Sequence, residues 1–198
     1  MTTLLLTLLL AGATAKAKPP VKPAAASVVR PVVEPEPAAA RQEARRCEET
    51  EGDPEVALQA CREALRLGLR EPRQTAVRQL LAVRLADAGR FEELVEAYRE
   101  DTQLHPEDPL CWRRLGAALL FLKEDAAAAR PALEEAQRLR PDDPETLVQL
   151  GLCLNGLGLH SEAVASFEAA LQIDPEALGL RPAARAAFEA SRRGEKWP

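Results

Sequence analysis

Apolar residues recur every three or four positions from residue 38 to residue 193, a spacing that places them along one side of successive α-helices. No stretch alternates apolar and polar residues over the length of a strand. Residues typical of helix starts and turns separate the helical stretches. In an Asp-Pro pair the Asp oxygen caps a helix and the Pro fits its first turn, and a Gly between two helices adopts a left-handed conformation. These residues are Asp53-Pro54, Asp108-Pro109, Asp143-Pro144, Gly89 and Gly158. The pattern predicts eight or nine helices and no strands.

Two neighbouring units in the second half of the chain carry similar residues at nearly the same offsets. The first unit reads Trp112, Leu115, Gly116, Leu119, Ala129, Leu133, Ala136, Leu139 and Pro141. The second unit reads Leu147, Leu150, Gly151, Leu154, Ala163, Phe167, Ala170, Ile173 and Pro175. The period is 35 residues from Leu115 to Leu150 and 34 residues from Pro141 to Pro175. These units resemble the tetratricopeptide repeat family, whose signature is W-x2-L-G-x2-Y, then A-x3-F, then P.

Two weaker copies precede these units. In the nearer copy Asp101 takes the place of the small residue expected where the two helices cross, which puts the usual packing there in question. In the first copy only the second helix matches, through Ala57, Cys61 and Ala64. The resemblance implies an all-α, tetratricopeptide-type helical-hairpin solenoid of about four repeats, the first degenerate, closed by a capping helix. The repeats are 38–72, 73–108, 109–143 and 144–177, and the capping helix is 181–193, with Ala184 and Phe188 facing inward.

Two helix starts in the second half are less well defined. Pro131 lies either near the start of a helix, where a missing N–H matters little, or at the first position of a helix that follows an Ala-rich turn. Ser161 is interpreted as the N-cap of the second helix of the last repeat.

The first 37 residues differ from the rest. Residues 1–17 combine a short apolar stretch with two A-x-A sites, which predicts a secretory signal peptide, although no Lys or Arg precedes the apolar stretch. An uncleaved anchor, a misassigned start and an organellar transit peptide are the alternatives. Residues 18–37 are rich in Pro and Ala and predict a flexible linker that samples polyproline II. The chain is therefore expected to be exported to the periplasm or cell envelope, or secreted as the less favoured variant. The 21 Arg and 5 Lys are typical of a bacterium with a GC-rich genome.

Catalytic and metal sites find little support in the residue pattern. The two histidines, His105 and His160, occupy turns of the repeat where polar residues are ordinary. No Ser lies in an arrangement with His and an acid, and the glycines near Gly151 lack the Lys-Ser/Thr of a phosphate loop. No C-x-x-C pair exists, so no zinc site is predicted. A net charge of −5 argues against nucleic acid, and the mature chain has no stable membrane span. We expect no enzyme and no cofactor.

Cysteines raise the question of a disulfide, because an even number of them follows the predicted signal peptide. Cys47 and Cys61 lie on the two antiparallel helices of the first repeat, with an axial offset of about 4.5 Å at a rise of about 1.5 Å per residue. This offset is borderline for a bond. The alternative is that both are buried free thiols. A bond between Cys111 and Cys153, in adjacent repeats, is less favoured.

The resemblance also implies a binding surface. In this family the first helix of each repeat lines a concave groove at fixed positions. Carried onto this chain, these positions are Gln42, Arg46, Gln79, Val83, Arg113, Arg114, Ala117, Leu120, Val148, Gln149, Leu152 and Asn155. Chaperone-binding members of the family hold a C-terminal carboxylate with a Lys/Asn/Asn/Lys/Arg set. This chain lacks that set, and only Arg113, Arg114 and Asn155 are similar to it.

The sequence therefore predicts an exported adaptor that binds a protein or peptide partner through this groove. Arg113 and Arg114 would meet an acidic group, beside an apolar pocket at Val148 and Leu152. The alternatives are that the groove positions are merely solvated helix faces, or that the repeats serve self-association without a separate client. An enzyme is the least favoured reading.

Overall fold

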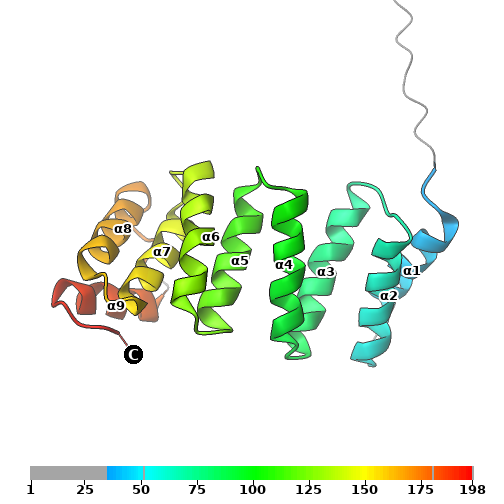
Figure 1. Cartoon of the computed structure of the whole chain (residues 1–198), viewed down its shortest axis with the longest axis horizontal. Helices are drawn as coiled ribbons and strands as arrows, with labels where there is room; N and C mark the ends of the chain where they lie inside the picture. The colour runs from blue at the N-terminus through cyan, green and yellow to red at the C-terminus, as the bar shows by residue number, and fades with distance from the viewer. Residues whose placement is uncertain (1–34, 51, 180, 198) are drawn as a thin grey trace, which may run out of the picture. The chain divides into compact units, whose positions relative to one another are not determined.

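A computed structural model describes residues 35–50, 52–179 and 181–197. Within these residues nine α-helices follow one another and no strand occurs, as the sequence predicts (Figure 1). The helices are α1 (Ala38–Glu49), α2 (Pro54–Arg66), α3 (Arg73–Asp87), α4 (Phe91–Leu104), α5 (Pro109–Phe121), α6 (Ala126–Leu139), α7 (Pro144–Gly156), α8 (His160–Ile173) and α9 (Pro182–Arg192). The predicted signal peptide and the predicted linker up to residue 34 lie outside the described residues.

The first eight helices form four antiparallel hairpins, one in each predicted repeat. Each hairpin packs against the next along the chain, because one hairpin alone leaves its apolar face exposed. Helix α9 packs against both α7 and α8 at the end of the array (Figure 1). The observed order is that of a tetratricopeptide-type solenoid.

Asp side chains define several helix starts. Asp53, Asp108 and Asp143 accept hydrogen bonds from backbone N–H groups of the first turns of α2, α5 and α7. Asp125 does the same for α6, so that this helix begins at Ala126 and Pro131 lies inside it. The alternative start at Pro131 is therefore wrong.

The assignment of Ser161 as a helix cap is also wrong. Helix α8 begins at His160, and its N-cap is Leu159, two residues before Ser161, which makes no side-chain capping bond. The apolar helical pattern was correct for this segment, and only the identity of its first residue was misjudged.

The signature glycines allow the two helices of a hairpin to approach closely. A Cβ atom on Gly116 would lie 2.6 Å from Cγ of Leu133, and one on Gly151 would lie 2.8 Å from the ring of Phe167. Both distances are far below van der Waals contact, so only Gly fits these crossings.

The buried apolar residues form two clusters rather than one. The first core cluster contains Ala40, Ala44, Cys47, Leu58, Ala60, Cys61, Ala64, Leu69, Val77, Leu81, Ala82, Leu85 and Leu94. The second core cluster runs from Val95 on α4 to Ala187 on α9. Tyr98 on α4 lies against both clusters. The boundary between them therefore falls in the second repeat, on α4, where Leu94 belongs to the first cluster and Val95 to the second.

Candidate peptide-binding cleft

A charged pair replaces apolar packing at this boundary. Arg78 on α3 donates from Nη1 to Oδ1 of Asp101 on α4 at 3.4 Å, and the two side chains are only 16% and 14% exposed. In the third repeat the corresponding places are held by Trp112 and Ala136. The sequence signalled that Asp101 was unusual, and the structure supplies its partner. Because two charged side chains fill this space, the apolar core cannot continue through it.

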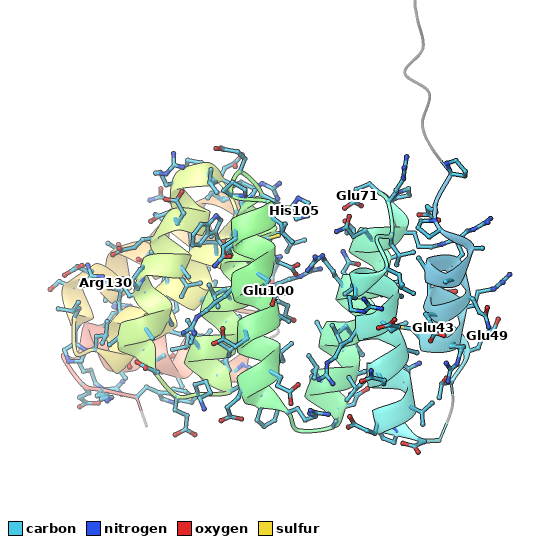
Figure 2. All side chains as sticks on the ribbon, turned by 45° about the vertical axis from the view of Figure 1, so that its right-hand side comes forward. Glu43, Glu49, Glu71, Glu100, His105 and Arg130 are labelled. Carbon is cyan, nitrogen blue, oxygen red and sulfur yellow. A yellow bond between two sulfur atoms is a disulfide. The ribbon has the colours of Figure 1, made fainter. Side chains whose placement is uncertain are left out.

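A cleft opens beside the pair, between the first helices of the second and third repeats. Within the described part of the chain, α3 and α5 do not pack against each other, whereas α1 packs against α3 and α5 packs against α7. The cleft has a volume of about 90 Å³. Its lining comprises Thr75, Arg78, Gln79, Asp101, His105, Asp108, Leu110, Cys111 and Arg114. Glu100 lies on α4 on the side turned to α3, and His105 follows the C-terminal end of that helix (Figure 2).

Some charged residues of the cleft have partners within the protein and others do not. Asp108 accepts from the backbone N–H of Leu110 at 2.9 Å as the cap of α5, and Asp101 holds Arg78. Among the described residues, half-buried Arg114 has no acidic partner within ion-pair distance. The guanidinium of Arg114 is therefore the cation of this cleft that is available to a ligand.

Burial raises the pKa of the Asp101 carboxyl, while the positive charges of Arg78, His105 and Arg114 act in the opposite direction. Burial likewise raises the pKa of the Cys111 thiol to about 11, with a further contribution from the charge of Asp108. A thiol with this pKa is protonated at neutral pH, so Cys111 is not a reactive nucleophile.

Arg113 differs from its neighbour Arg114. Its Nη1 atom donates to Oδ2 of Asp143 at 3.1 Å, which ties α5 to the start of α7. The predicted basic pair is thus divided between an internal ion pair and a free cation in the cleft.

The other predicted groove residues of the second and third repeats differ in exposure. Gln79 lines the cleft and Val83, four residues further along α3, is 55% exposed. Ala117 and Leu120 on α5 are half-buried, and Leu120 packs against the second core cluster. An apolar surface therefore continues from the cleft along α3 and α5.

The predicted groove residues of the fourth repeat are more covered. Val148 and Asn155 are each 1% exposed, so neither presents its side chain to solvent. Leu152 is half-buried against the second core cluster, and Gln149 donates from Nε2 to Oε1 of Glu145 at 2.9 Å. Helix α9 packs against α7 and explains why this end of the expected groove is closed.

The first repeat lies apart from the cleft. Gln42 and Arg46 are exposed on α1, and Arg46 pairs with Glu43 at 3.0 Å. A shallow pocket brings Arg46 beside Gln59 and Glu63 of α2 rather than beside α3. The structure therefore does not bring Arg46 together with Arg114.

The cysteines form one bond and leave two thiols. Cys47 and Cys61 are joined in a disulfide between α1 and α2, with 4.8 Å between their Cα atoms. Cys111 and Cys153 are free and buried. Among the described residues, no cluster of His, Cys, Asp and Glu could hold a metal ion, and no helix is long and apolar enough to cross a membrane.

A family model described as "Tetratricopeptide repeat" matches residues 32–173. The chain belongs to the tetratricopeptide repeat family. This confirms the family and the fold class that the spacing of Gly116, Gly151 and the other signature residues predicted.

Several tetratricopeptide proteins and other sequences are similar to the chain over short regions. The Hsp70-Hsp90 organizing protein of Triticum aestivum is 32% identical over 94 residues, which cover 48% of this chain and 16% of that protein. The protein O-mannosyl-transferase TMTC1 of Mus musculus is 33% identical over 112 residues, which cover 54% of this chain and 12% of that protein. The chain thus spans less than a fifth of the length of these relatives.

Solved tetratricopeptide structures share the fold. A crystal structure of MamA has a TM-score of 0.64 and 21% identity, and covers 79% of this chain and 82% of its own. The structure of YrrB, described as "a TPR protein with an unusual peptide-binding site", has a TM-score of 0.57 and 22% identity. The match covers 78% of this chain and 73% of that chain. The structure described as "TPR2AB-domain:pHSP90-complex of yeast Sti1" has a TM-score of 0.52 and 14% identity, and the match covers 77% of this chain and 69% of that chain.

Proposed function

We propose that this chain is an adaptor that binds a protein partner by holding an acidic group of an extended peptide in the cleft between α3 and α5. The observation that carries the proposal is the half-buried Arg114, which lines this cleft and has no acidic partner within the described residues. A desolvated guanidinium attracts a carboxylate more strongly than an exposed one does. The ligand's acidic side chain or C-terminal carboxylate would meet Arg114.

Apolar groups beside the cleft would hold the rest of the peptide. Val83 is exposed one turn beyond Gln79 on α3, and Phe121, two turns beyond Arg114 on α5, is 53% exposed. A carboxylate followed by apolar side chains is the pattern of peptide that fits these features. The proposal assigns binding and not catalysis, in keeping with two proteins of similar fold, YrrB with its peptide-binding site and yeast Sti1 in its pHSP90 complex.

A displayed library of random peptides of about 12 residues, selected on the full chain, tests the cleft. We expect Asp or Glu to be enriched among the selected peptides. Replacement Arg114→Ala should weaken their binding by about 1–3 kcal/mol, which is about 5- to 150-fold. The matched control is Arg138→Ala, which removes the same charge from an exposed position on α6.

Equal loss of affinity in both variants would show that only the net charge matters and would contradict the cleft. Circular dichroism of both variants checks that helix content is unchanged. Little change in stability is expected, because neither side chain belongs to the apolar core.

The proposal places the adaptor outside the cytoplasm, in the periplasm or cell envelope of a bacterium. Two features support export: the apolar stretch with A-x-A sites in residues 1–17, and the disulfide between Cys47 and Cys61. Natively expressed protein should begin near Lys16 or Lys18 when its N-terminus is sequenced. Recovery of intact Met1 from a cytosolic fraction would contradict export.

A further inference from the structure

The segment that follows α9 turns back toward α7. Helix α9 ends at Arg192, and Gly194 has a φ of 72°, a left-handed conformation that Gly adopts without strain. The backbone N–H of Glu195 then donates to the carbonyl of Ala190 at 2.9 Å and closes the helix end. Residues 195–197 consequently leave α9 in a fixed direction, below α7 in Figure 1.

Asn155, near the C-terminal end of α7, holds this segment by its main chain. Its Nδ2 group donates to the carbonyl of Glu195 at 3.0 Å, and its Oδ1 atom accepts from the backbone N–H of Trp197 at 2.8 Å. Nδ2 also donates to Oγ of Ser191 on α9 at 2.7 Å. A carbonyl and an N–H two residues apart lie on the same edge of an extended segment, so a single amide can contact both.

Asn155 makes no hydrogen bond to a side chain of residues 195–197. Glu195, Lys196 and Trp197 are all exposed, and none of them belongs to either core cluster. Trp197 keeps 36% of its surface accessible. Because only main-chain atoms are contacted by Asn155, a segment of different sequence would make the same two hydrogen bonds.

The polar amide is specific to α7. One repeat earlier, 35 residues back, the corresponding residue is Leu120, which packs against the second core cluster. Asn155 is the only Asn in the chain of 198 residues. Its side chain is 1% exposed, and a buried amide is stable only when its donors and acceptor are satisfied. The position is therefore built to hold a main-chain segment, and it loses two partners whenever residues 195–197 leave.

We propose that Asn155 forms a slot for the main chain of an extended peptide, which residues 195–197 occupy in the free protein and which an extended segment of a partner takes by displacing them. The slot and the Arg114 cleft involve different helices, so each can fail without the other. Residues 195–197 have the advantage of being tethered, because attachment to α9 gives them an effective concentration of about millimolar.

Asparagine labelling gives a direct measurement. With [15N]asparagine, the NMR spectrum of the full chain contains one side-chain amide pair, from Asn155. A chain that ends at Gly194 keeps all of α9, and its Asn155 pair should shift because two hydrogen bonds are lost. The probe is the acetylated and amidated peptide Gly-Glu-Lys-Trp, which copies residues 194–197. Added at about 5 mM, it should move the pair more than halfway back to its position in the full chain.

Two control peptides separate main-chain recognition from other binding. A peptide in which Ala replaces Lys should act within about threefold of the probe, because its main chain and its partly covered Trp ring are unchanged. A peptide methylated on the Trp backbone nitrogen lacks the N–H that Oδ1 accepts, and it should have no effect.

A protein control tests the amide itself. Asn155→Leu in the shortened chain copies the Leu of the preceding repeat, so the helices should persist in circular dichroism, and a fluorescent form of the probe should no longer bind. Binding equal to that of the Asn155 protein would overturn the proposal. So would a shortened chain whose amide pair does not move, a methylated peptide as effective as the probe, or a full chain that responds to the probe as readily as the shortened one.

Discussion

The disulfide between Cys47 and Cys61 should supply much of the stability of the first repeat. Its removal by reduction changes no other atom, and the Cys side chains are both fully buried. The bond closes a loop with a sequence separation of 14 residues. Loop closure of this length is worth about 3 kcal/mol through the restricted unfolded chain.

The packing of α1 explains why this amount matters locally. The buried residues of its 12-residue helix are Ala40, Ala44 and Cys47, all of them small. Such a short helix is marginal without tertiary contacts, and these side chains bury little apolar area. Reduction should therefore release α1 before the rest of the array, whose second core cluster is built from larger residues such as Leu133 and Phe167.

The assay is hydrogen exchange with and without a reducing agent, combined with urea unfolding followed by circular dichroism. Amides of α1 should exchange much faster after reduction, while those of α7 and α8 should change little. The control variant, Cys47→Ala with Cys61→Ala, should not respond to the reductant, although Cys111 and Cys153 remain. Unchanged exchange in α1, with a stability difference below about 0.5 kcal/mol, would refute the reasoning.

Two further predictions concern the packing of the array. Gly151→Ala should destabilise the chain by about 1–3 kcal/mol in urea unfolding, because the new methyl group overlaps the ring of Phe167. The control is Gly156→Ala in the same helix, whose new Cβ atom lies 3.4 Å from its nearest neighbour and should change stability little. Asp101→Ala should destabilise by about 1–3 kcal/mol, because it leaves Arg78 with only the exposed Glu100, at 3.9 Å, as an acidic partner. Arg78→Leu combined with Asp101→Ala should be neutral or stabilising by about 1–4 kcal/mol. A double variant less stable than the single one would contradict this account.

The fold was predictable because its signals are local. Apolar spacing and Asp-Pro pairs fix each helix within about four residues, and a period near 35 residues is visible without any structure. The start of α6 was ambiguous for a local reason, since Pro is tolerated both within the first turns of a helix and at its first position. Repeats of this kind contact their neighbours in sequence order, which makes their arrangement readable from the chain.

The site was only partly predictable, because it depends on pairs that are distant in sequence. Arg114 was selected by its repeat position, but the same rule selected Arg113, which is committed to Asp143. Asn155 was placed in an open groove, and the structure buries it beneath residues 195–197. No periodic pattern in the sequence indicates that a segment 40 residues later will return to α7.

The cleft and the divided core have one physical origin. Arg78 and Asp101 occupy places that hold apolar residues in the third repeat, and beside them α3 and α5 do not pack as α5 and α7 do. An apolar pair would join the two core clusters and add burial, which is why the double substitution is expected not to destabilise. The same substitution would remove the polar wall beside Arg114. We therefore expect the double variant to retain or gain stability while losing affinity for acidic peptides, the combination that arises when a polar site is maintained at the expense of packing.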